Sequence, residues 1–79
     1  MKWAYAIFTK DYNFETMGGT RTWNKGRIRP VRGDTQIRDD GMMLVYSLTN
    51  YGAWHGIEAE NFALVEGKAE AEKFAATLA

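Results

Sequence analysis

The sequence contains no cysteine, which excludes disulfide bonds and thiolate metal sites as sources of stability. Its formal net charge is zero, which argues against a global electrostatic attraction to nucleic acid. No stretch approaches the roughly 20 apolar residues that span a bilayer. The first ten residues alternate in size and do not form the leucine-rich core of a signal peptide. We therefore expect a soluble cytoplasmic protein with no membrane partner.

The residues of hydrolytic and metal chemistry are also scarce. His55 is the only histidine and Ser47 the only serine, whereas nucleophilic catalysis needs a nucleophile, a base and an orienting group within hydrogen-bonding distance. His55 is better explained as a surface residue of a strand, and the run 39–41, Asp-Asp-Gly, as a hairpin turn rather than a cation site. No glycine-rich loop opens a helix. We therefore expect no enzymatic activity, no cofactor and no metal.

What the chain does contain is a large apolar set, 46% of its residues, arranged in short runs typical of strands. The pattern predicts strands at 2–9, 27–32, 42–49, 53–57 and 63–65, with one helical turn at 59–62. Residues 10–23 indicate a long irregular hairpin with a returning arm at 20–23. Pro30 makes 27–32 an edge or bulged strand, and 42–49 is the most strand-like run, so we expect it to be central.

After residue 67 the spacing changes. Ala71, Phe74, Ala75 and Leu78 follow the i, i+3, i+4, i+7 pattern of one helix face, which predicts a helix over 68–78. Short strands joined by turns favour a barrel, because closure removes unpaired strand edges. We therefore expect a mainly β fold, a small five-stranded barrel at 1–66 with a short C-terminal α-helix at 67–79 packed on it.

One segment resembles a known family. Residues 56–65, Gly-Ile-Glu-Ala-Glu-Asn-Phe-Ala-Leu-Val, resemble the closing segment of SH3-like barrels, and 25–31 and 44–55 are similar to strands of short SH3-like proteins of bacteriophages and prophages. Ala59 replaces the family's proline, and the segments with which eukaryotic SH3 domains bind proline-rich ligands are absent. The resemblance therefore implies the fold and not the ligand. The resemblance also implies a function: small virus-encoded proteins of this type often inhibit host nucleic-acid machinery, and anti-CRISPR proteins are examples.

Charge is divided along the chain. Residues 1–38 carry a net charge of +5 and residues 39–79 a net charge of −5, and no acidic residue occurs between 16 and 33. Arginine forks and aromatic faces suit phosphates, stacked bases and protein interfaces. The candidate partner-binding residues, all cationic or aromatic, are Arg21, Trp23, Lys25, Arg27, Arg29, Arg32 and Trp54.

Three explanations of these residues stay open. In the first, they form a surface that docks on a host protein or protein complex, a nucleoprotein included. In the second, they contact DNA or RNA directly. In the third, they are a solvated strand face whose charges prevent pairing of the strand edge with other chains. We favour a non-catalytic protein-binding module, with direct nucleic-acid binding as the alternative. The dispersed acidic residues of the second half are explained by solvation and by favourable charges in the first turn of the helix.

Overall fold

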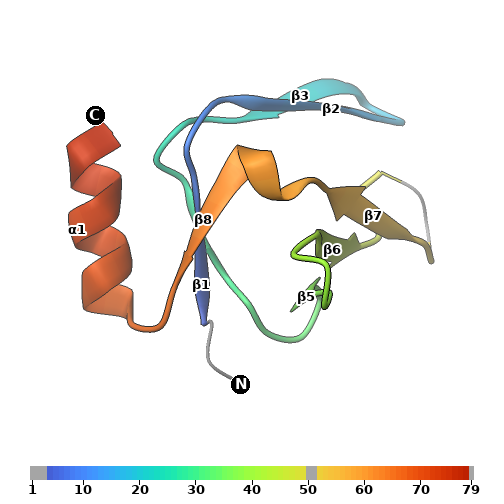
Figure 1. Ribbon diagram of the computed structural model, residues 1–79. Helices are drawn as coiled ribbons and strands as arrows, with labels where there is room; N and C mark the ends of the chain where they lie inside the picture. Colours follow the sequence, from blue (N-terminus) through green and yellow to red (C-terminus); the bar gives the residue numbers. More distant parts are fainter. Residues whose placement is uncertain (1–3, 50–51, 79) are drawn as a thin grey trace.

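The computed structural model describes residues 4–49 and 52–78, and these contain eight strands, one 3-10 turn and one α-helix (Figure 1). The strands are β1 (Tyr5–Phe8), β2 (Tyr12–Thr16), β3 (Gly19–Trp23), β4 (Ile28–Pro30), β5 (Thr35–Ile37), β6 (Met43–Tyr46), β7 (Trp54–Ile57) and β8 (Phe62–Val65). The 3-10 turn η1 covers Ala59–Asn61, and the helix α1 covers Lys68–Leu78.

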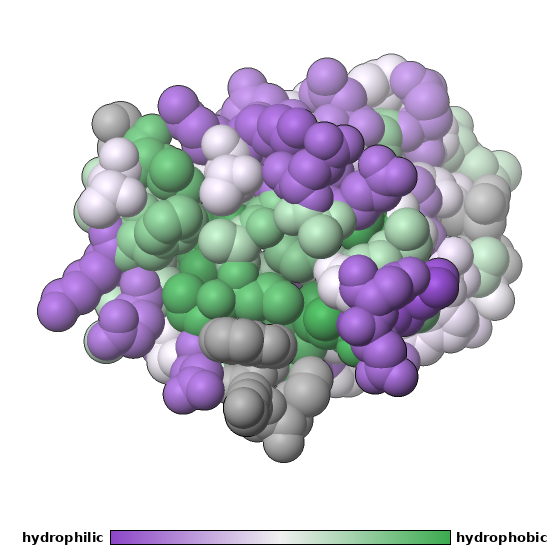
Figure 2. Space-filling view, viewed as in Figure 1, coloured by the Kyte–Doolittle hydropathy of each residue, from purple (hydrophilic) through white to green (hydrophobic). Residues whose placement is uncertain are grey.

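The strands form three small antiparallel sheets. The first has the order β4-β1-β8, the second is the hairpin β2-β3, and the third has the order β5-β6-β7. In Figure 1 the hairpin lies across the top of the molecule, above β7, and α1 lies at the left, beside the first sheet and on the side away from β7. Hydrophilic residues gather over the hairpin in the space-filling view (Figure 2).

The core lies between the three sheets. Alternation along β1 directs Ala6 and Phe8 to one face and Ile7 to the other, and all three are fully buried. Ala6 and Phe8 join the buried cluster that Met43, Val45, Ile57 and Phe62 complete. The opposite face of the sheet is covered by α1, which contacts β1, β4 and β8.

The predicted five-stranded barrel is not formed. The described strands are eight, and they divide into three separate sheets instead of one closed cylinder. Within the described residues β2 and β3 pair only with each other, so no continuous ladder of strands connects β1 to the third sheet. The mainly β class with a C-terminal helix is confirmed.

Several element predictions are confirmed in detail. The helix covers 68–78, and its predicted face is the one that packs, with Ala71 fully buried. The strand containing Pro30 is an edge strand, and β6 is the middle strand of its sheet. None of the helices in the described ranges is long and apolar enough to cross a membrane.

Candidate functional site

The β2-β3 hairpin presents two different faces. Tyr12 lies opposite Trp23 and Phe14 opposite Arg21, and directly opposed residues of an antiparallel pair share a face. These four side chains therefore share the inner face, on which the three aromatic rings pack over the core and Arg21 is exposed. The outer face is polar: Thr22 donates a hydrogen bond to Asn13 (2.6 Å), and the Thr20 hydroxyl donates to Glu15.

Trp23 is the centre of the predicted site. Its ring meets the edges of two aromatic rings, Phe8 at 5.4 Å and Phe14 at 5.1 Å between centroids. The guanidinium carbons of Arg27 and Arg29 each lie 4.9 Å from the ring centroid. A cation this close to an indole is attracted by the negative face of the ring. The indole therefore orders two arginines.

Arg21 belongs to the same group. It precedes Trp23 by two residues on β3, so both side chains are on the inner face, and both line a hollow of about 340 Å³. Its other lining residues are Phe14, Thr16 and Leu48. We call this hollow the arginine groove. Its floor is apolar and aromatic, Arg21 is the cation in its lining, and Arg27 and Arg29 adjoin it through the Trp23 ring.

The two arginines over Trp23 are not equivalent. The Arg29 side chain is only 17% exposed, and its Nε donates to the hydroxyl of the buried Thr35 (2.8 Å). Its Nη2 pairs with Asp34 (3.2 Å), and the Thr35 hydroxyl donates to the other oxygen of Asp34 (3.1 Å). Arg27 is exposed and has no ion pair among the described residues. Arg29 is therefore a structural residue, whereas the Arg27 guanidinium is available to a partner.

The remaining predicted residues lie around this group or away from it. Lys25 and Arg32 are exposed in the connections before and after β4. Trp54 is 43% exposed and meets Tyr46 in an edge-to-face contact, with 5.1 Å between the ring centroids. Alternation along β7 places Trp54 on the opposite face from His55, whose ring meets the hairpin. Trp54 therefore faces away from the arginine groove.

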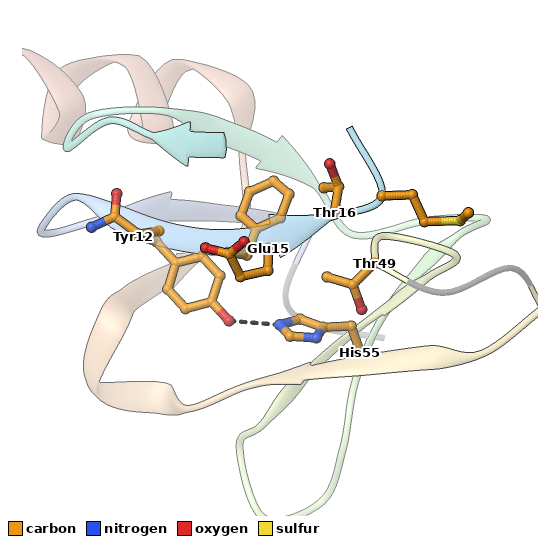
Figure 3. A pocket seen from close by; sticks show the side chains of 8 residues that line it. Tyr12, Glu15, Thr16, Thr49 and His55 are labelled. Carbon is orange, nitrogen blue, oxygen red and sulfur yellow. Dashed lines mark hydrogen bonds between the residues drawn. The ribbon is translucent and has the colours of Figure 1, made fainter. Parts of the chain in front are cut away.

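A second hollow, of about 480 Å³, lies beside β2 (Figure 3). Its lining consists of residues 12–17 from the hairpin and Thr49 and His55 from the opposite wall. We call it the edge groove. A hydrogen bond of 2.6 Å joins the Tyr12 hydroxyl to His55 Nε2 across the two walls. Burial is the main cause that raises the pKa of Tyr12 above its ordinary value, and the negative charge of Glu58 raises it further.

Sequence reasoning placed His55 on the surface and did not identify the edge groove. His55 is half-buried, and its partner Tyr12 is 43 residues away in the chain, so spacing carried no sign of the pair. Ser47 accepts a hydrogen bond from the backbone N–H of Gly52 (2.9 Å). Within residues 4–49 and 52–78, no three His, Cys, Asp or Glu side chains gather as metal ligands.

Comparisons with known proteins give no relative for this chain: no family model, no curated protein and no solved structure matches it.

Proposed function

We propose that this protein is a non-catalytic, cytoplasmic binding module that docks on an acidic surface of a partner protein through the arginine groove. The observation that carries the proposal is the ordering of arginines by Trp23, with two guanidinium groups 4.9 Å from one ring and Arg21 beside it. An arginine held by an aromatic ring loses less conformational freedom on binding than a free one.

The chemistry of the groove fits a protein partner. Interface hot spots are rich in arginine and tryptophan, and they combine a desolvated apolar floor with a few charged groups. Phe14 and Leu48 supply the floor, and Arg21 and Arg27 supply cations that pair with no described carboxylate. The resemblance of residues 56–65 to phage SH3-like proteins adds the hypothesis that the partner belongs to host nucleic-acid machinery and that binding inhibits it.

The test is affinity capture with a charge-reversal variant. Arg21→Glu combined with Arg27→Glu should abolish capture of the partner from host lysate, with partners identified by mass spectrometry. Arg29 is left intact because its contacts with Thr35 and Asp34 support the fold. The matched control is Lys68→Glu with Lys73→Glu, which makes the same change of charge on exposed positions of α1. Equal capture by both double variants would exclude the arginine groove as the docking surface.

Direct nucleic-acid binding is distinguished from protein binding by the dependence of affinity on salt concentration. A phosphate-directed site weakens steeply as ionic strength rises, because binding releases counterions. Titration of labelled single- and double-stranded DNA and RNA at two ionic strengths therefore gives the discriminating measurement. Binding that weakens steeply with salt would favour the nucleic-acid alternative, and the absence of binding at low salt would exclude it.

A further inference from the structure

The strand β2 has a free backbone edge. A two-residue turn joins Thr16 to Gly19, and these two residues form the last pair of the ladder. In such a hairpin the pair next to the turn exchanges backbone hydrogen bonds. From there along the ladder, pairs that exchange hydrogen bonds alternate with pairs that do not. The backbone groups of Thr16, Phe14 and Tyr12 therefore point to β3. Those of Asn13 and Glu15 point away from it.

Nothing in the described part of the chain uses these outward groups. The backbone bonds outside the ladders do not involve the N–H or C=O of Asn13 or Glu15, and no described side chain reaches them. Both residues are exposed. A row of unpaired strand groups is a template for the addition of another strand.

The edge groove lies along this row. Six of its lining residues are consecutive, 12–17, which is the signature of a hollow that follows the length of one strand. The Tyr12–His55 hydrogen bond lies at one end of the groove (Figure 3). Met17, which is 93% exposed in the turn of the hairpin, marks the other end. Thr49 and His55 form the far wall. The hollow therefore has the position that a third strand beside β2 would occupy.

The side chains along the groove define the chemistry of such a strand. Residues of an added antiparallel strand that lie opposite Asn13 and Glu15 would share the outer face with the Glu15 carboxylate, which favours a cation there. The residues between them would turn inward, toward the rings of Tyr12 and Phe14, which favours apolar side chains. Glu58, which acts electrostatically on Tyr12, adds a second negative charge near the inner wall.

We propose that the edge groove binds an extended segment of a partner protein, in which basic and apolar residues alternate, by pairing it with the outward backbone groups of Asn13 and Glu15. This site adjoins the arginine groove, with which it shares Phe14 and Thr16, but it uses the backbone edge of β2 and not the side chains of β3. The preferred charge is opposite: the arginine groove takes an acidic surface, and the edge groove takes a basic strand.

The experiment uses a blocked peptide, Lys-Val-Lys-Val-Lys, titrated into the isotope-labelled full chain and followed by two-dimensional NMR. The expected result is a saturable shift and slowed hydrogen exchange at the amide groups of Asn13 and Glu15. In the proposed register the lysine N–H groups point to β2 and the valine N–H groups point to solvent. N-methylation of the lysines should therefore weaken binding at least about tenfold for the lost hydrogen bonds, and N-methylation of the valines should leave it nearly unchanged.

These two methylated peptides form a matched pair that leaves the protein unaltered. A Glu-Val-Glu-Val-Glu peptide should not bind, and Glu15→Pro should abolish binding because proline removes the outward N–H at a position that β3 does not use. Equal binding of the two methylated peptides, or the absence of saturable shifts at both amides, would overturn the proposal. Self-association through β2 without peptide would also overturn it, because a second copy would then be the occupant.

Discussion

Arg27 and Arg29 allow the roles of two similar side chains to be separated by measurement. Both guanidinium carbons are 4.9 Å from the Trp23 centroid, but only Arg29 also binds Thr35 and Asp34. Replacement of each by methionine keeps an unbranched stem that packs on the ring and removes the charge and the donors. The difference between the two variants therefore measures the contacts that Arg29 makes beyond Trp23.

The expected magnitudes follow from the contacts. Loss of a hydrogen bond from a charged donor to a buried group is worth about 1.5–3 kcal/mol. The pair with Asp34 adds less than about 1 kcal/mol, because the Asp34 side chain is 61% exposed. Thr35 keeps its bond to Asp34, which limits the loss. We expect Arg29→Met to lower the free energy of unfolding by about 2–3 kcal/mol, and Arg27→Met by about 0.5–1 kcal/mol from its cation–π contact alone.

Urea titration and calorimetry give the measurement. For a domain of this size, about 2–3 kcal/mol corresponds to a decrease of roughly 10–20 °C in Tm, and the Arg27 variant should stay within about 8 °C of the parent. Arg29→Lys serves as the control. Lysine keeps the charge but lacks the planar fork that reaches Thr35 and Asp34 together, so it should recover only part of the loss. Equal destabilisation by Arg27→Met and Arg29→Met would refute the assignment of Arg29 as structural.

Two further predictions concern Tyr12 on the hairpin and Gly26 in the turn that follows it. The raised pKa of Tyr12 means that the folded state favours the neutral phenol, so its contribution to stability is complete below about pH 10 and is lost as pH rises through the raised pKa. Phenolate absorbance should show that Tyr12 ionises at a higher pH than an ordinary tyrosine. Glu58→Gln should lower the pKa of Tyr12 only in part, because burial is the larger cause of the increase. An unchanged titration in this variant would contradict the role of Glu58. Gly26 has a φ of +94°, so Gly26→Ala should destabilise the protein by about 1–2 kcal/mol in urea titration, and an unchanged midpoint would show that the turn adapts.

The elements that could be predicted are those whose signal is local. The helix over 68–78 depends on a repeat within its own eleven residues, and the burial of β1 on both faces depends on four consecutive apolar residues. The single proline indicated an edge strand because it lacks a donor. Each of these inferences used residues within one element, and the structure confirms them.

The barrel and the edge groove depend on pairing between distant segments. The hairpin has a regular alternation, Tyr12 and Phe14 inward against Asn13 and Glu15 outward, but the glycines at 18–19 suggested an irregular excursion. Whether β2 continues a barrel or lies at the edge of a sheet depends on which strand pairs with it. The pattern of its own residues does not predict that partner. The same reason explains why Arg29 and Arg27 looked alike in sequence: Arg29 differs through its contacts with Asp34 and Thr35, which the chain after β4 brings next to it.

The regular alternation of the hairpin also explains how one small element offers two adjacent surfaces of different chemistry. Side chains on its inner face create the arginine groove, since Arg21 and Trp23 lie on β3 and line the hollow together with Leu48. Backbone groups at the outer edge of β2 create the edge groove, because pairing with β3 uses only every second residue. One surface depends on side chains and the other on main chain, so reversal of charge at Arg21 and proline at Glu15 act on different chemistry. If there are two sites, each variant should lose one binding activity and keep the other. If each variant loses both activities, the substitutions act by unfolding the hairpin.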